Sequence, residues 1–138
     1  MSDLDEIRRV IALYSQLVDD KRFDEWGELF TTDAVFEARG NRIVGRSSIV
    51  GTIGPMMAPA VTKHLAGAPV IDLLDDDRAR AWTDLATFVR GEGGVSVATI
   101  GRYYDELRRE DGRWRLSARV LVMTGDPVPH DCAPGPAA

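Results

Sequence analysis

The sequence has 138 residues, of which 44% are hydrophobic and 28% charged, a length and composition typical of one globular domain. Seventeen lysines and arginines stand against 22 aspartates and glutamates, which gives a net charge of −5. This balance argues against nucleic acids and anionic membranes as partners, because both require a basic surface. One cysteine and two histidines exclude an internal disulfide and leave little material for a metal site, so no metal is expected. No signal peptide or membrane-spanning segment is visible, and a cytoplasmic location is expected.

Three helices are predicted in the N-terminal half, with two short strands between the second and the third. The helices are expected over residues 3–19, over 24–30, and from Gly45 to Pro59, and the strands over 34–37 and 42–44. The first helix is the best defined, because Ser2 is a suitable N-cap and apolar side chains recur behind it at helical spacing. Thr31, Thr32 and Asp33 are expected to form a break after the second helix.

The C-terminal half is predicted to consist of strands, with turn chemistry between them. The expected strands cover residues 61–74, 79–90, 95–109 and 113–124. Helices followed by an antiparallel meander indicate the α+β class. A curved antiparallel sheet with three helices over its concave face would form a cone-shaped α+β barrel that encloses a pocket. Residues 1–125 are expected to form this single domain, and the proline-rich residues 126–138 an irregular tail.

His64 is the first candidate for chemistry. It lies near the start of a predicted strand and shares one face with two alanines, whose small side chains leave room for a ligand. A structural hydrogen bond would explain a histidine at this position equally simply. Asp19 and Asp20 end the first helix, where a carboxylate opposes the helix dipole. Either could be solvated, or could orient His64 as a general base.

Further polar and aromatic residues have two possible roles each. Arg119 is a lone charge entering an apolar stretch, which fits an anion site or an ion pair between subunits. Tyr14 lies on the apolar face of the first helix and could belong to the core or to the pocket. Asp84 lies in the middle of a strand and could face the pocket or the solvent. The remaining candidates for the pocket wall or the core are Trp26, Trp82, Phe88 and Met123.

Two other patterns carry little weight. The glycine-rich segment 91–94 follows a strand but does not open a helix, so it is not a phosphate-binding loop. His130, Asp131 and Cys132 could be drawn as a nucleophile cluster, but the proline-rich tail gives them no rigid support.

Taken together, five stretches of the chain resemble the SnoaL-like branch of the nuclear transport factor 2-like superfamily. They are residues 13–19, 26–36, 45–49, His64 and 101–116. The resemblance covers nearly all of the chain apart from the tail. It implies the cone-shaped fold but only narrows the chemistry, because many reactions occur on this fold.

Within that superfamily the chain is most similar to three lyases: scytalone dehydratase, bile-acid 7α-dehydratase and hexachlorocyclohexane dehydrochlorinase. These enzymes use an aspartate–histidine dyad, and their aspartate stands eleven residues before an aromatic residue that corresponds to Phe30. This spacing selects Asp19 over Asp20. Their histidine opens the strand after the third helix, which corresponds to His64.

Two more residues are implied by the same resemblance. The dehydrochlorinase has an arginine five residues after the tryptophan of its final strand, which corresponds to Arg119 after Trp114. The bile-acid enzyme has a tyrosine five residues before its aspartate, which corresponds to Tyr14. The second histidine of scytalone dehydratase falls near Val89 here, so that enzyme's own reaction is not implied.

The resulting hypothesis is a cofactor-independent lyase that acts on a small apolar or cyclic substrate. His64, oriented by Asp19, would remove a proton from carbon, and Arg119 and Tyr14 would stabilise the developing oxyanion or the leaving group. An isomerase or polyketide cyclase would use the same proton abstraction, and a non-catalytic small-molecule binding module is the third alternative. A homo-oligomer is expected, because residues 95–124 carry apolar side chains on both faces. The resemblance implies a trimer first, as in the lyases, and a dimer second, as in the wider superfamily.

Overall fold

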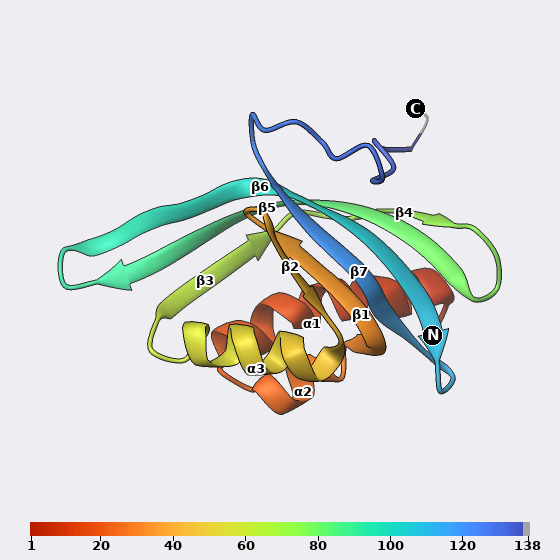
Figure 1. Ribbon diagram of the computed structural model, residues 1–138, viewed down its shortest axis with the longest axis horizontal. Coiled ribbons are helices and arrows are strands. Elements are labelled where there is room, and N and C mark those ends of the chain that lie inside the picture. Colours follow the sequence, from red (N-terminus) through yellow and green to blue (C-terminus); the bar gives the residue numbers. More distant parts are fainter. Residues whose placement is uncertain (137–138) are drawn as a thin grey trace.

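The computed structural model describes residues 1–136, in which three helices lie against one face of a curved sheet (Figure 1). The helices are α1 (Asp3–Asp19), α2 (Phe23–Gly27) and α3 (Arg46–Met57). The strands are β1 (Phe30–Ala38), β2 (Asn41–Val44), β3 (Val61–Ala66), β4 (Val70–Leu73), β5 (Arg78–Gly91), β6 (Gly94–Glu110) and β7 (Arg113–Met123). The α+β class predicted from the sequence is confirmed.

The strands form one open, mixed sheet in the order β2-β1-β7-β6-β5-β3, and β4 also pairs with β5. The expectation of an antiparallel sheet needs one correction, because β1 runs parallel to β7. After β1 the chain forms β2, α3 and the strands β3 to β6. Strand β7 then pairs with β1 and runs in the same direction. The sheet curves around the helices without closing into a complete barrel.

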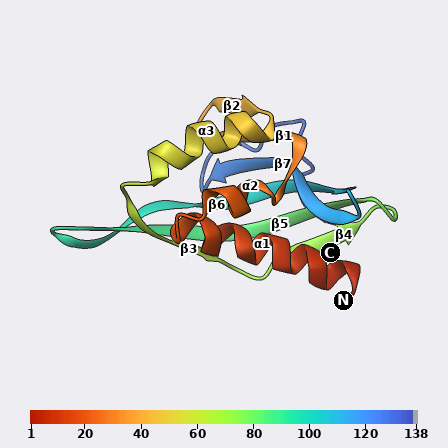
Figure 2. The same cartoon turned by 90° about the horizontal axis from the view of Figure 1, so that it is seen from below.

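The helices cover the concave face of the sheet, as the view from below shows (Figure 2). The Ser2 hydroxyl caps α1 by accepting a hydrogen bond from the backbone N–H of Asp5 at 3.1 Å, as the sequence predicts. The apolar stripe of α1 packs into the core with the side chains of Ile7, Val10, Ile11, Tyr14, Leu17 and Val18. The apolar side of α1 therefore faces the space between the helices and the sheet.

Three expected boundaries differ from the structure. The break at residues 31–33 is wrong, because β1 already begins at Phe30 and the preceding Leu29 carbonyl accepts from the N–H of Leu116 at 2.7 Å. The second helix is shorter than expected, because α2 ends at Gly27. The expected strand over 61–74 is two strands, β3 and β4, separated at residues 67–69.

Glycine at position 101 permits the close approach of β6 and β7. A Cβ atom at Gly101 would lie 2.5 Å from the carbonyl oxygen of Val122, closer than any side chain could be accommodated.

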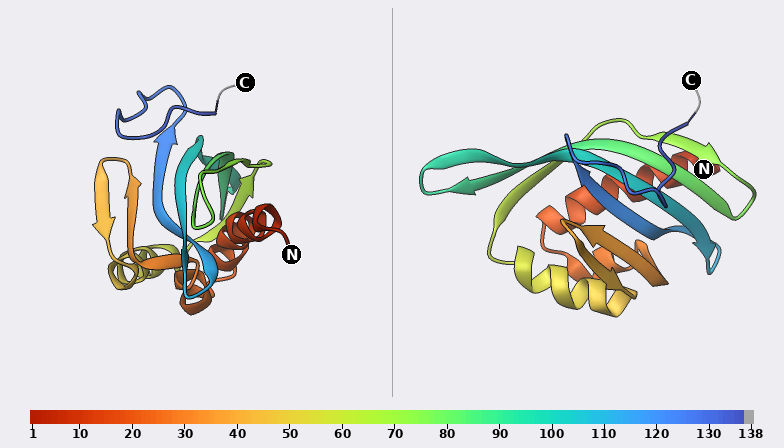
Figure 3. Two further views of the ribbon diagram at one scale, coloured as in Figure 1. Left: turned by 90° about the vertical axis from the view of Figure 1, so that its right-hand side faces the viewer. Right: turned by 45° about the horizontal axis from the view of Figure 1, so that its top comes forward.

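The tail that follows β7 lies on the outer face of the sheet, opposite the helices (Figure 3). Residues 126–136 have no regular secondary structure. The indole N–H of Trp82 donates to the carbonyl of Ala133 at 3.0 Å, which holds this segment against β5. Residues 126–136 therefore do not lie over the concave face. None of the helices described for residues 1–136 is long and apolar enough to span a membrane.

Candidate active site

A cavity of about 390 Å³ lies between α1, α3 and the concave face of the sheet. This volume falls within the range of roughly 300–1,000 Å³ that is usual for small-molecule sites. Its wall is mainly apolar and includes Val18, Phe36, Ile53, Leu85, Val89 and Leu121. Hydroxyl groups, the His64 ring and one arginine interrupt this apolar wall, so the cavity offers a few polar contacts in a largely apolar space.

The Asp19 carboxylate and the His64 ring are in direct contact at this wall. The distance from Asp19 Oδ1 to His64 Nδ1 is 2.6 Å, and the two side chains are only 7% and 10% exposed. The backbone N–H of His64 donates to Asp19 Oδ2 at 2.8 Å. Thr62 donates its hydroxyl proton to Oδ1 at 2.9 Å. Asp20, the neighbouring aspartate, is exposed.

Helix α1 and strand β3 bring these residues together from distant parts of the sequence. Asp19 is the last residue of α1, where the helix dipole disfavours a carboxylate. The three hydrogen bonds from Thr62 and His64 offset this disadvantage. The start of β3 is held in turn by antiparallel pairing with β5, where His64 lies opposite Thr87. Two regular elements thus fix both partners of the contact.

The contact with Asp19 decides which nitrogen of His64 can act as a base. An ionised carboxylate only accepts hydrogen bonds, so Nδ1 must carry the proton that lies between the two groups. Nε2 is then the nitrogen with the free lone pair, and no protein group within residues 1–136 hydrogen-bonds to it. His64 also lines the cavity. This tautomer suits proton abstraction by Nε2, with Asp19 stabilising the imidazolium that forms.

Two tyrosines supply hydroxyl groups to the same cavity. Tyr14 comes from α1 and Tyr103 from β6, and their ring centres are 5.6 Å apart. Burial raises the pKa of the Tyr14 hydroxyl, and burial also raises the pKa of Tyr103 well above its ordinary value. Both hydroxyls are therefore protonated at neutral pH and can donate hydrogen bonds.

Arg119 lies behind these tyrosines and does not line the cavity. Its guanidinium carbon is 4.1 Å from the ring centre of Tyr14 and 3.7 Å from that of Tyr103. Its Nε and Nη2 atoms each donate to the Asp105 carboxylate at 2.8 Å, and neither side chain is exposed. The alternative of an ion pair between subunits is therefore wrong, since the partner lies in the same chain. The expectation that Arg119 contacts a substrate directly is wrong as well, because its side chain does not line the cavity.

The charge of Arg119 is fixed by its partner. Burial alone lowers the pKa of the Arg119 guanidinium, but the charge and hydrogen bonds of Asp105 outweigh burial and raise that pKa above its ordinary value. Its Nη1 atom is buried without a hydrogen-bond partner among the described residues. The permanent positive charge therefore acts on the cavity through the rings of Tyr14 and Tyr103.

Four residues expected at the pocket wall lie elsewhere. Trp26 is fully buried in the core and packs its ring against Tyr14 at 5.4 Å. Asp84 and Phe88 have the same parity along β5 and point away from the cavity, because Leu85, Thr87 and Val89 point into it. Asp84 forms an exposed ion pair with Arg102 at 2.6 Å.

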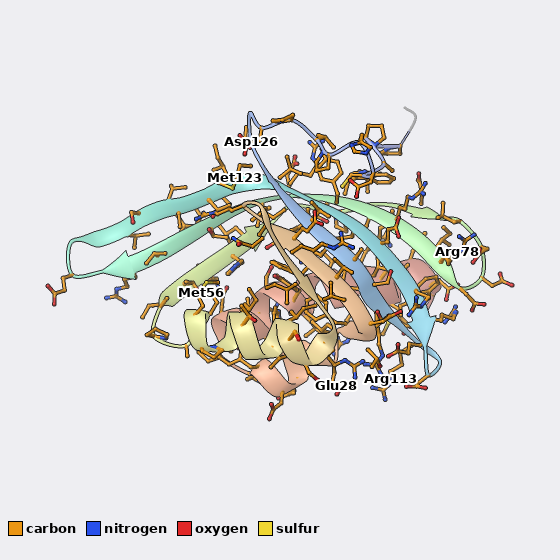
Figure 4. The ribbon with its side chains drawn as sticks, viewed as in Figure 1. Glu28, Met56, Arg78, Arg113, Met123 and Asp126 are labelled. Carbon is orange, nitrogen blue, oxygen red and sulfur yellow. The ribbon has the colours of Figure 1, made fainter. Side chains whose placement is uncertain are left out.

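Met123 is the fourth correction. It ends β7 beside the turn that carries Asp126, above the sheet and away from the cavity (Figure 4). The tail cluster of His130, Asp131 and Cys132 lies on the outer face, and Asp131 and Cys132 line a separate hollow of about 190 Å³ there. Within residues 1–136, no group of three or more histidine, cysteine, aspartate or glutamate residues is arranged to hold a metal ion.

Three residues of the site were not singled out in the sequence. Thr62 stands two residues before His64 on the same strand face, and this spacing could have identified it as a second partner of Asp19. Tyr103 and Asp105 lie in an ordinary strand pattern. Only the pairing of β6 with β7 reveals that Asp105 faces Arg119.

Helices on the concave face of an open, curved sheet, with a cavity between them, define the nuclear transport factor 2-like class of α+β domains. Residues 1–120 match the family model of the SnoaL-like domain, and the chain belongs to this family. The superfamily includes dehydratases, isomerases and cyclases, and its domains bind small molecules. The comparison with curated proteins gives no match.

Solved structures show the same fold. A protein of unknown function from Mycobacterium tuberculosis is 24% identical with a TM-score of 0.80, covering 86% of this chain and 69% of its own. A nuclear transport factor 2-like protein with a cystatin-like fold from Novosphingobium aromaticivorans is 22% identical with a TM-score of 0.81, covering 91% and 84%. A candidate scytalone dehydratase from the same organism is 22% identical with a TM-score of 0.77, covering 100% of both chains.

Proposed function

We propose that the protein is a cofactor-independent lyase in which Asp19 and His64 form the general base. The observation that carries this proposal is the 2.6 Å contact between Asp19 Oδ1 and His64 Nδ1 at the wall of an apolar cavity. It leaves Nε2 free to accept a proton from a substrate. Exclusion of water strengthens the hydrogen bonds and charges that act inside such a cavity.

The proposed reaction is an elimination in a small apolar or cyclic molecule. The proton on carbon passes to His64 Nε2, the electrons of the C–H bond form the new double bond, and the leaving group departs with its own bonding pair. Tyr14 donates a hydrogen bond to the oxygen or leaving group on which negative charge develops. Arg119 acts as a positioning residue, because its charge reaches the substrate only through Tyr14 and Tyr103.

Isomerisation or cyclisation would begin with the same proton transfer and differ only in retaining the leaving group. The test is therefore made in two steps with β-hydroxy and β-halo carbonyl compounds. Exchange of the acidic C–H for deuterium in D₂O reports proton abstraction, and new ultraviolet absorbance reports the double bond. Exchange without absorbance favours an isomerase or cyclase. Binding without exchange, in a panel that includes tight binders, favours a non-catalytic binding module and contradicts the lyase.

We also propose that the chain forms a homo-oligomer, a trimer first and a dimer second. Apolar side chains on the protruding β5–β6 hairpin support this, because Val95, Val97 and Ile100 are each more than half exposed in the single chain. Water contact with such residues is unfavourable, and burial against a second copy would remove it. The tail occupies part of the outer face near Trp82, which leaves the hairpin as the more accessible apolar surface.

A further inference from the structure

The cavity wall carries one permanent charge. Among its lining residues Arg39 is the sole arginine, and no lysine, aspartate or glutamate belongs to the wall described within residues 1–136. The Asp19 carboxylate lies behind His64 and Thr62 and is already hydrogen-bonded by them. A ligand in this cavity therefore meets an apolar wall with a single positive group at the β1–β2 turn.

The backbone at Arg39 adopts a conformation that arginine disfavours. Arg39 and Gly40 form the two-residue turn between β1 and β2, with φ angles of 51° and 78°. This is the positive-φ geometry of a tight hairpin, for which asparagine and glycine are the favoured residues. An arginine is strained in this conformation, and strain of this kind occurs preferentially at functional sites. The turn alone does not explain why an arginine stands at its first position.

The Arg39 side chain is held in place while part of it remains free. Its Nη2 atom donates to Thr99 Oγ1 at 3.1 Å and to the carbonyl of Ala98 at 3.5 Å. Thr99 and Ala98 belong to β6, which is separated from β1 in the sheet by β7. Nε and Nη1 have no hydrogen-bond partner among the described residues, and no carboxylate within that part of the chain lies within 4.0 Å of Arg39. The anchored guanidinium thus keeps donors available for a ligand.

We propose that Arg39 makes this cavity a site for apolar molecules that carry a carboxylate. The apolar part would occupy the space beside His64, and the carboxylate would accept hydrogen bonds from the free nitrogens of Arg39. Each free N–H of the guanidinium can donate a charge-assisted hydrogen bond to the carboxylate, which is stronger than a hydrogen bond between neutral groups. This inference rests on the proposed function of the same cavity and narrows its substrate class to small carboxylic acids.

The test uses two probes of nearly equal shape, 2-naphthoate and 2-naphthamide, with binding measured by calorimetry at pH 8 in 50 mM salt. We expect the wild-type protein to bind the carboxylate at least ten times more tightly than the amide, as charge-assisted hydrogen bonds imply. In Arg39→Asn the ratio should fall below about twofold while the amide affinity is unchanged. Equal binding of the two probes by the wild type overturns the proposal, and so does a ratio that survives in Arg39→Asn.

Asparagine is chosen because it tolerates the positive φ at this turn, so the variant should unfold at the same temperature as the wild type or higher. The matched control is Arg42→Asn, three residues away in the same hairpin. Arg42 does not line the cavity and pairs with Glu37 at 2.7 Å on the surface. It should keep the full preference for the carboxylate. A second measurement needs no variant: 500 mM salt should weaken carboxylate binding and leave amide binding unchanged.

A further variant separates this inference from the proposed function. His64→Ala should lose elimination activity and retain the preference for 2-naphthoate, because Arg39 provides it. If the preference disappears in His64→Ala and persists in Arg39→Asn, the carboxylate binds at His64 and the inference about Arg39 is wrong. Elimination with equal binding of the two probes would leave the lyase proposal intact and overturn only the carboxylate site.

Discussion

Asp105 and Arg119 face each other in register on β6 and β7 and hold each other by two hydrogen bonds of 2.8 Å, with neither side chain exposed. The two tyrosine rings that line the cavity lie against the guanidinium of this pair. The pair therefore links the stability of the sheet to the shape of the site.

Removing one member of the pair should destabilise the fold. Arg119→Met leaves the Asp105 carboxylate buried without a partner, and we expect a loss of about 3–5 kcal/mol in the free energy of unfolding. The double variant Arg119→Met/Asp105→Leu should recover most of this loss, because an apolar pair of similar volume removes the unpaired charge. Urea unfolding followed by tryptophan fluorescence measures both. A single variant as stable as the wild type would contradict this account.

The double variant also tests the role of Arg119 in catalysis. If its charge strengthens the hydrogen bond from Tyr14 in the transition state, the folded double variant should show a lower kcat with a nearly unchanged KM. A lower affinity with unchanged kcat would instead indicate that the arginine serves only to shape the cavity.

The dyad gives the most direct prediction. His64→Ala and Asp19→Asn should each lower turnover by about 100- to 10,000-fold, the usual effect of losing a general base or its correct tautomer. The melting temperature of His64→Ala should change little, because His64 lies at a cavity wall that water can enter. Asp20→Asn is the matched control, since Asp20 is exposed next to Asp19. Undiminished elimination in a well-folded His64→Ala protein would end the proposal that His64 is the base.

Low pH should weaken the attachment of α1 to the β6–β7 hairpin. Hydrogen bonds from Arg109 and from the indole of Trp114, at 2.5 and 3.2 Å, hold the pKa of Asp3 below its ordinary value. A pKa lowered by folding stabilises the protein above the unfolded pKa of about 4, and this stabilisation is lost as the pH falls through the folded pKa.

The corresponding experiment compares urea unfolding of Asp3→Asn and the wild type between pH 7 and pH 3. The variant should be less stable at pH 7, and the difference should shrink below about pH 4. Asp20→Asn, the same change at the C-cap of α1, is the control, because the exposed Asp20 side chain forms no hydrogen bond among the described residues. A difference between Asp3→Asn and the wild type that stays constant across the whole range would contradict the prediction.

Self-association is predicted to depend on the β5–β6 hairpin. Sedimentation at micromolar concentration should show a trimer, or failing that a dimer, and Val97→Arg should shift it to smaller species by placing a charge on the apolar surface. Ser96→Arg adds the same charge at the adjacent position of β6 and serves as the control. A monomeric wild-type protein would refute the prediction.

Local patterns predicted the parts of the fold and site that depend on local chemistry. The extent of α1 follows from its cap and apolar stripe. The contact between Asp19 and His64 joins distant parts of the chain, and it was the family resemblance that implied it. The parallel pairing of β1 with β7 could not be predicted, because periodicity within a strand carries no information about a neighbour more than eighty residues away. The same reason hid the partner of Arg119.

The remaining errors concern side chains that point away from the cavity or that fill the core. Residue type makes Asp84 and Phe88 candidates for the pocket, but their parity along β5 places them on the other face from Thr87. Trp26 belongs to the core because α2 packs its ring among aromatic neighbours. A large apolar side chain in a sequence does not distinguish between a filled core and an open cavity.

The segment after β7 gives the protein a natural place for a spectroscopic probe. Cys132 is the chain's single cysteine, and it is half-buried on the outer face of the sheet, across from the cavity. Burial raises the pKa of the Cys132 thiol, so alkylation should be slow while the segment remains attached to Trp82. The labelling rate would then measure how often this segment detaches, and a dye attached there would leave the substrate cavity untouched.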